Sequence, residues 1–360
     1  MGKYRPAVIL TLAITVFLAS CTGISDDPKW VVTTFASGFN SPRGMAVRLS
    51  SSGNLENFYV ADTGGHLIKE ITPAGKVTIL AGSGTAGLTN DIGTAAQFDG
   101  PRGVAVDSSG NVYVADTENH LIRKITITTS TLNNVVTKTA TVTRFAGKLT
   151  NGAGTYGFAN GAGLTEAQFN RPLDVAVDGD NVYVADTGNH LIRKITFTTV
   201  NDVVTAAVST LAGSRTRGFA NGAGTEAQFA APVGVAVDGD NLYVADMFNS
   251  CIRKIIISKI ATSDGVSTLA GQFNKPSGVA VDSSDNIDNI YVADLGNNRI
   301  RKITITTTTL NGVDTKTATV STVAGSGAAA LQSPSGVAVV GNNIYVTDTD
   351  NHRIRKIELK

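Results

Sequence analysis

The chain has few cysteines, few aromatic residues and no long helical pattern. Its 360 residues include two cysteines and one tryptophan, and aromatic residues make up 6% of the total. Two cysteines cannot form a disulfide framework, so the core and the strand pairing must hold the fold together. Beyond the extreme N-terminus, no long segment repeats its apolar residues every 3.6 positions. Together these absences favour an all-β protein.

Charge of either sign is not in excess. The chain has 30 lysine and arginine residues against 29 aspartate and glutamate residues. Loss of residues 1–20, which include Lys3 and Arg5, would leave 28 of the 30 basic residues. A balance this close to neutrality gives no general attraction to a polyanion, so no nucleic-acid partner is expected.

One repeated unit dominates the rest of the sequence. Its phrase Tyr-Val-Ala-Asp, or Tyr-Val-Thr-Asp in the last copy, begins at Tyr59, Tyr113, Tyr183, Tyr243, Tyr291 and Tyr345. Each copy follows a proline corner, at Pro42, Pro101, Pro172, Pro232, Pro276 or Pro334. The corners lie 44 to 71 residues apart, near or above the length of a four-stranded propeller blade. No unit of this size can bury its own apolar face, so six units predict one closed ring.

Each unit is predicted to form four short strands. In the second unit these are 103–106, 111–116, 121–127 and 140–146, separated by Gly, Asn, Asp and Ser. The small first run suits the crowded axis, and we expect the Arg-Lys pair of the third run at the wet rim. The sixth unit lacks a fourth run, but a spare one lies at 30–36. We expect that segment to complete the last blade and close the ring.

The pattern resembles the NHL repeat. Residues 101–125 and 172–195 match it almost throughout, from Pro-x-Gly-Val-Ala-Val to His-Leu-Ile-Arg-Lys-Ile, although Asp174 replaces the glycine in the third unit. The resemblance covers about residues 30–358 and implies a six-bladed β-propeller. It implies less about function, because NHL propellers serve as protein- or RNA-binding platforms, as extracellular sensor domains and, in one relative, as a peptide-amidating lyase.

The N-terminus is predicted to be an export signal. Lys3 and Arg5 precede an apolar stretch, residues 7–18, that is too short to span a membrane as a helix. Small residues directly before Cys21 resemble the lipobox of bacterial lipoproteins, which implies cleavage before Cys21 and a lipid on that residue. An ordinary signal peptide with an incidental cysteine is the alternative. We therefore expect a signal at 1–20, a tether at 21–29 and one propeller domain at 30–360.

Thr22, rather than aspartate, follows the cysteine. In the Gram-negative sorting pattern this resembles an outer-membrane destination, so we expect an exported, monomeric lipoprotein of the outer membrane. Cys251 aligns with Leu67, Leu121 and Leu191 and is expected to be a small buried apolar residue.

Residues repeated in every unit are expected to be structural. The four histidines, His66, His120, His190 and His352, share one repeat position. Equivalent positions on different blades are held apart, so they cannot surround one metal ion, and we expect them to pack between blades. The aspartate of each Tyr-Val-Ala-Asp phrase is expected to accept backbone N–H bonds in the following turn. No metal and no cofactor are predicted.

The working surface is predicted on the face that carries the corners and the long glycine-rich loops 83–100, 148–171 and 214–231. Two of these loops share the phrase Gly-Phe-Ala-Asn-Gly-Ala-Gly. Asn160 and Asn221 at their tips are candidate contacts. Phe158, Phe219, Phe169 and Phe229 are expected to pin the loops down.

Positions that differ between units near the axis are the remaining candidates. Arg43 and Arg102 follow their corner prolines, and Asp174 stands nearby in the third unit. These charges could bind a carboxylate or phosphate group at the channel mouth, or they could be a solvated rim. The threonine-rich hairpins around 128–139, 198–205 and 306–317 should project on the opposite face, where a partner strand could pair.

Two functions follow from this pattern. The first is a surface-anchored, non-enzymatic scaffold that binds a protein or a small ligand of the cell envelope through the loop-bearing face. The second is a lyase or hydrolase with its site at the channel mouth. No nucleophile–base pair and no acid pair stands out in the differences between units, which favours the scaffold.

Overall fold

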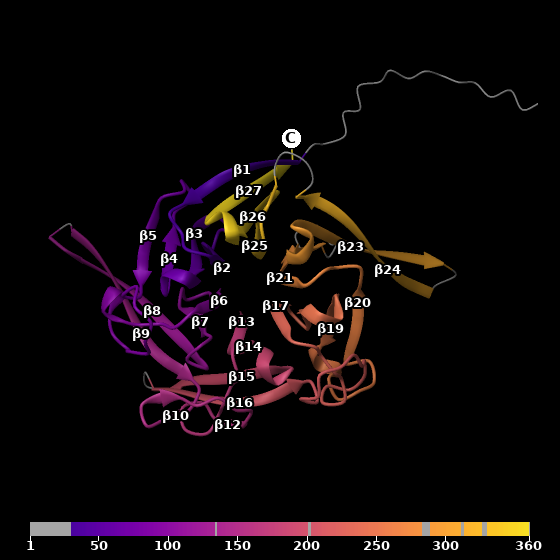
Figure 1. The fold of residues 1–360 in the computed structure, drawn as a ribbon, viewed down its shortest axis with the longest axis horizontal. Coiled ribbons are helices and arrows are strands. Elements are labelled where there is room, and N and C mark those ends of the chain that lie inside the picture. The colour runs from indigo at the N-terminus through magenta and orange to yellow at the C-terminus, as the bar shows by residue number, and fades with distance from the viewer. Residues whose placement is uncertain are drawn as a thin grey trace, which may run out of the picture.

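The computed structural model of the chain describes residues 30–133, 135–200, 203–282, 289–310, 313–325 and 330–359. Its strands form six antiparallel blades around a central axis (Figure 1). The all-β, six-bladed propeller predicted from the repeats is confirmed. The expected signal at 1–20, Cys21 and the tether at 21–29 lie outside the described residues.

In every blade the strand after the corner proline lies nearest the axis, and the others follow outward. Blade 1 contains β2 (Pro42–Leu49), β3 (Leu55–Asp62), β4 (Leu67–Ile71) and β5 (Val77–Ala81). Blade 2 contains β6 (Pro101–Val106), β7 (Val112–Asp116), β8 (Leu121–Leu132) and β9 (Val135–Ala146). Blade 3 contains β13 (Pro172–Asp178), β14 (Asn181–Asp186), β15 (Leu191–Val200) and β16 (Val203–Ala212), with the short β12 (Gly161–Ala162) added outside β16.

Blade 4 contains β17 (Pro232–Asp238), β18 (Asn241–Asp246), β19 (Cys251–Ile256) and β20 (Val266–Ala270). Blade 5 contains β21 (Pro276–Asp282), β22 (Asn289–Asp294), β23 (Arg299–Leu310) and β24 (Val313–Ala324). Blade 6 contains β25 (Pro334–Val340), β26 (Asn343–Asp348), β27 (Arg353–Leu359) and β1 (Trp30–Ser37). A separate hairpin pairs β10 (Leu149–Thr150) with β11 (Ala153–Gly154).

Single 3-10 turns follow the second strand of most blades. They are η1 (Thr63–Gly65), η3 (Thr187–Asn189), η4 (Met247–Asn249), η6 (Leu295–Asn297) and η7 (Thr349–Asn351). Two more, η2 (Gly93–Ala95) and η5 (Ile257–Lys259), lie elsewhere in loops. Within the part of the chain that the structure describes, no helix is long and apolar enough to cross a lipid bilayer.

Strand β1 closes the ring as predicted. It pairs antiparallel with β27, from Trp30 opposite Leu359 to Ser37 opposite Arg353 (Figure 1). Phe35 of β1 also packs against Phe58 of blade 1 and Tyr345 of blade 6, at ring centroid distances of 5.4 and 4.9 Å. The seam therefore has both backbone pairing and a shared aromatic core.

The innermost strands approach one another as closely as their small side chains allow. A Cβ atom on Gly336 would lie 2.2 Å from the carbonyl oxygen of Arg43 in the next blade. Every innermost strand also has a register shift just after its corner proline, where the two residues after Pro101, for example, fall out of the ladder. Bulges of this kind re-aim side chains, and here they direct the residues after the corner toward the axis.

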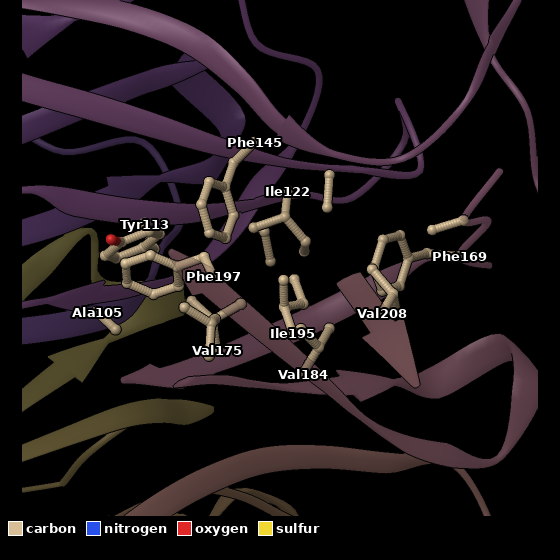
Figure 2. Close-up of a cluster of buried hydrophobic side chains, with 14 residues drawn as sticks. Ala105, Tyr113, Ile122, Phe145, Phe169, Val175, Val184, Ile195, Phe197 and Val208 are labelled. Carbon is tan, nitrogen blue, oxygen red and sulfur yellow. The ribbon is translucent and has the colours of Figure 1, made fainter. Parts of the chain in front are cut away.

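The core lies between blades rather than within them. Figure 2 shows the cluster between blades 2 and 3, where Phe145 packs edge to face against both Tyr113 and Phe197. The ring centroids of Phe145 and Phe197 lie 5.4 Å apart at an interplanar angle of 82°. Because each blade buries its face only against its neighbours, the ring has to close for all six faces to be covered.

Two predictions about individual side chains have different outcomes. Cys251 is buried, as expected from its alignment with leucines. The third-strand arginines do not reach the wet rim: Arg123, Arg193 and Arg253 are fully buried. The expectation that these charges are solvated is therefore wrong for blades 2–4, because long loops cover them there.

The threonine-rich hairpins extend the third and fourth strands, as expected. Strands β8, β9, β23 and β24 each have 12 residues, and their ends project beyond the ring on opposite sides (Figure 1). Because these turns join strands three and four, they lie at the blade ends away from the proline corners.

Candidate functional site

The loop-bearing face is held by one hydrogen-bond network that recurs in each blade. In blade 2, Asp116 Oδ1 accepts the backbone N–H of Asp99 at 2.7 Å. Its Oδ2 accepts bonds from Asn119 Nδ2 at 2.9 Å and from Arg123 Nη1 at 2.8 Å. The repeated aspartates therefore are structural, but the backbone N–H they bind belongs to the loop before the corner proline and not to the turn that follows.

The buried arginines of blades 2–4 bind the long loops. Arg193 Nη2 donates to Ala159 O at 2.8 Å and to Asn160 Oδ1 at 2.7 Å, while Nη1 bonds Gln168 O and Asp186. The arginines of the neighbouring blades do the same with Asn90 and Asn221. A buried ion pair is tolerated when most of its other donors are satisfied. Here the loops accept bonds from the Nη atoms, and, among the described residues, only the Nε atom of each arginine is buried without a partner.

Asn160 and Asn221 thus have an internal role. Both residues are exposed, but each Oδ1 accepts a bond from a buried arginine and a weaker one from a threonine, Thr210 or Thr268. Asn90 occupies the matching place in the loop 83–100, although its loop lacks the shared phrase. Their prediction as partner contacts stays a prediction, and only their outward faces are free to serve it.

The histidines lock neighbouring blades together, as expected. His120 Nδ1 accepts the backbone N–H of Arg171, the residue before the next corner proline, at 3.0 Å. His66, His190 and His352 make the matching bonds to Gly100, Ala231 and Ser41, and Asn298 makes it to Ser333. Both partners of each bond have left-handed backbone. Because Nδ1 accepts this bond, the ring proton of the neutral imidazole lies on Nε2, so in this arrangement neither nitrogen offers a metal ion a free lone pair.

The loop phenylalanines divide into two classes. Phe169 and Phe229 are fully buried, as the pinning prediction requires. Phe158 and Phe219 are 46% and 57% exposed, so that prediction is wrong for them. The shared phrase turns outward at its phenylalanine because the following alanine and asparagine face the buried arginine.

A small cavity on the axis brings together the other candidates. Its volume is about 90 Å³, and Arg43, Arg102 and Asp174 all line it, with Ser277 and Ser335 across the ring. The space is enough for several water molecules, at about 10–15 Å³ for each. The structure therefore places the three charged residues singled out by sequence in one site, at the bulges that aim them inward.

The two arginines of this cavity are electrostatically unsatisfied. Burial lowers the pKa of Arg43, and burial together with the positive charge of Arg43 lowers the pKa of Arg102 to about 10. The Nε atoms of both are buried without a hydrogen-bond partner. Asp350 and Glu118 offset part of this repulsion from a distance. A bound anion would remove the rest.

Asp174 is the departure from the repeat at the axis. It replaces the glycine that other blades have there, and its Oδ2 accepts the backbone N–H of Val235 in blade 4 at 3.0 Å. Burial raises the pKa of its carboxyl group to about 7, because the two backbone N–H groups it faces only partly oppose that effect. With a pKa of about 7, both protonation states of this carboxyl group are populated near neutral pH.

Some functional features were missed by reading the sequence. The period-2 rule was a usable signal for the buried arginines, because Arg123 shares a strand face with Leu121 and Ile125, which are both buried. No local signal marks Asn90 or the exposed rings of Phe158 and Phe219, since their environment depends on how long loops meet across two blades.

Comparison with known proteins supports the repeat assignment. Residues 98–125, 169–195, 273–303 and 331–357 match the sequence model of the NHL repeat. NHL repeat-containing protein 2 of Homo sapiens is 28% identical over 354 residues, which cover 85% of this chain and 45% of that protein. The Bos taurus protein of the same name is 28% identical over 350 residues, covering 84% of this chain and 44% of that one. The chain thus spans less than half the length of these relatives.

Solved structures share the propeller at low sequence identity. A gluconolactonase from Xanthomonas campestris superimposes with a TM-score of 0.55 at 12% identity, covering 91% of this chain and 89% of that one. A catalytically inactive virginiamycin B lyase from Staphylococcus aureus gives 0.52 at 14% identity, covering 92% and 100%. These similarities show the fold alone. The four matched segments lie in blades 2, 3, 5 and 6, so four of the six blades of this propeller match the NHL repeat.

Proposed function

We propose that this propeller is a non-enzymatic binding scaffold that holds a protein or ligand on its loop-bearing face, with a carboxylate or phosphate group at the channel mouth. The observation that carries the proposal is the pair of arginines, Arg43 and Arg102, which line one axial cavity and whose charges repel each other. Such a pair is unfavourable in the free protein and favourable around an anion.

The test is anion binding measured by calorimetry with inorganic phosphate and citrate as probes. The variant Arg102→Gln should weaken binding by about tenfold or more, as expected for loss of a charge-assisted pair. The matched control is Arg215→Gln, on the same face but outside the cavity. Equal affinities of the wild-type protein and Arg102→Gln would refute the channel-mouth site.

A second candidate function is a lyase or hydrolase at the same mouth. The observation that favours it is Asp174, whose carboxyl group has a pKa of about 7 and lines the same cavity as two arginines. That combination suits a general acid or base next to a developing negative charge. Turnover of a lactone or peptide substrate that Asp174→Asn abolishes, while phosphate binding persists, would favour the enzyme over the scaffold.

Surface anchoring through Cys21 belongs to the same proposal. The lipobox-like sequence before Cys21 supports an exported bacterial lipoprotein, and Thr22 supports the outer membrane as its destination. Labelling of the expressed full chain with an alkyne fatty acid should mark the wild type and fail for Cys21→Ser. Wild-type protein that is exported without label would support the ordinary signal peptide instead.

A further inference from the structure

Four aromatic rings are exposed on the loop-bearing face of blades 3 and 4. Tyr156 is 71% exposed and Phe248 is 52% exposed, and Phe158 and Phe219, the two phenylalanines of the shared phrase, are exposed as well. Exposed aromatic side chains gathered on one face mark interaction sites.

Two arginines are interleaved with these rings. The guanidinium carbon of Arg215 lies 3.2 Å from the centroid of the Phe158 ring, and that of Arg217 lies 5.0 Å from the centroid of Phe248. Both arginines are exposed, and within the described ranges neither forms an ion pair. By contrast, Arg171 on the same face binds Glu118 at 2.6 Å. Five of these side chains form what we call the aromatic–arginine ridge: Phe158, Arg215, Arg217, Phe219 and Phe248. Tyr156 lies instead beside His120 of blade 2, with ring centroids 5.9 Å apart.

The ridge is supported from below by buried groups. Arg193 binds the carbonyl oxygen of Ala159, directly after Phe158, and Arg253 binds that of Ala220, directly after Phe219. The guanidinium of Arg253 also lies 5.0 Å from the Phe219 ring. Phe248 stands in the η4 turn (Met247–Asn249), whose Asn249 bonds the carbonyl oxygen of Gly218. The rings are thus held in place before any partner arrives, which lowers the entropy lost on binding.

The chemistry of the ridge identifies a class of partner. Arginine, tyrosine and phenylalanine are the residues enriched at the centres of protein interfaces. The unpaired charges of Arg215 and Arg217 favour a negative partner over a neutral or positive one, and the planar guanidinium matches a carboxylate. The near-neutral chain as a whole offers no general attraction, so the complementarity is local to the ridge.

We propose that the aromatic–arginine ridge docks an acidic segment of a partner protein, in which carboxylates alternate with aromatic or aliphatic side chains. This inference rests on the proposed scaffold function and names the partner of its loop-bearing face. It does not depend on the channel mouth, because the ridge and the cavity share no residue.

The probe is a random copolymer of glutamate and tyrosine, with a lysine–tyrosine copolymer as the charge-reversed control. Fluorescence anisotropy with the full-length protein should show saturable binding of the first and none of the second. Arg217→Ala and Phe248→Ala should each weaken binding by about tenfold or more, as interface centres do. Both residues are exposed, so the variants should unfold at the wild-type temperature.

The controls separate this inference from the channel-mouth site. Arg171→Ala removes an exposed arginine of the same face that is already paired, and Arg102→Gln removes the cavity arginine; both should change copolymer affinity by less than about twofold. If Arg102→Gln no longer binds phosphate but still binds the copolymer, the channel-mouth site and the ridge are independent. Either proposal can then fail without the other. Equal losses from Arg171→Ala and Arg217→Ala would overturn the ridge, as would absence of wild-type binding. Preference for alginate, an acidic polysaccharide, over the peptide copolymer would also overturn it.

Discussion

The two halves of the ring use the same repeat in different ways. In blades 2–4 the arginine of the third strand has no exposed side-chain surface, and its guanidinium binds both an aspartate and the loop above it. In blades 1, 5 and 6 the corresponding Lys69, Arg301 and Arg355 keep 12 to 14% of their side chains exposed. The loops that lead into blades 2–4 are long, and those into the other blades are short.

The difference shows how a loop becomes part of a repeat protein's rigid body. A long loop covers the cation and excludes water from its ion pair. Its carbonyl oxygens also accept hydrogen bonds from the Nη atoms of the arginine. A short loop leaves the same cation partly exposed to water, which weakens its ion pair. The exposed rings and unpaired arginines of the ridge occur only in the loop-rich half of the described residues, where the loops have this support.

The largest expected effect comes from breaking one buried pair. Arg193→Met should lower the free energy of unfolding by about 3–5 kcal/mol, because it leaves Asp186 buried without its cation and the loop 148–171 without its anchor. Arg301→Met, in the short-loop half, should lower it by less, about 1–3 kcal/mol, because Asp294 is also buried but its bond to Arg301 is long, at 3.4 Å, and the arginine is partly exposed to water. Urea unfolding followed by fluorescence measures both, and equal losses would mean that the loop cover adds nothing.

The short-loop half contains the seam, where the aromatic contacts of Phe35, rather than a loop-covered arginine, are expected to stabilise the ring. Phe35→Ala removes the ring that joins Phe58 to Tyr345, and a half-buried phenylalanine in a core contributes about 2–4 kcal/mol. The loss should appear in urea unfolding and as faster hydrogen exchange in β27. Phe35→Leu, which keeps most of the volume, should recover about half of it. If β27 exchanged its amide hydrogens at the same rate in Phe35→Ala as in the wild-type protein, this account would be contradicted.

Asp174 sets a pH dependence that the glycines of other blades lack. Its pKa of about 7 in the folded protein lies above its ordinary value of about 3.9. The folded state therefore holds this proton more tightly, so the group's stabilising contribution is full below about pH 4 and is lost as the pH rises through about 7. Asp174→Asn should raise the free energy of unfolding at pH 8 by on the order of 2 kcal/mol and leave it nearly unchanged at pH 4. The same gain at both pH values would show that ionisation is not the cause.

The smallest effect is expected at the links between blades. His120→Ala removes the acceptor for the N–H of Arg171 and should lower the free energy of unfolding by about 1 kcal/mol. His120→Asn should be close to wild type, because Asn298 already makes this bond in blade 5. Thermal unfolding of the pair distinguishes the hydrogen bond from ring packing, which asparagine would not restore.

Much of this fold follows from the sequence because each signal repeats six times. The corner prolines, the Tyr-Val-Ala-Asp strands and the spare run at 30–36 predict the blade count and the closure, and both agree with the structure. The axis site was partly predictable as well, since Arg43, Arg102 and Asp174 are departures from a regular background. These residues could be singled out only because six copies of the repeat show which residue is usual at each position.

The environments of the loops were not predictable in the same way. The Arg-Lys pairs have one sequence in all but the first unit, yet their arginines are buried in three blades and partly exposed in two others. Loop length decides between these outcomes, and it acts through contacts between segments about 30 residues apart. Phe158 and Phe169 belong to one loop but face opposite ways, which depends on the same contacts.

The pairing of β1 with β27 has a consequence for the order in which the ring is made. Thr33 and Lys356, which bond across this pair, are 323 residues apart, so the first strand of the ring to be synthesised must wait for the last. Until then the terminal blade offers an open strand edge that any other extended chain could occupy. A chain that stops before residue 353 lacks β27, so β1 has no partner and the ring keeps an open edge at which the protein could aggregate.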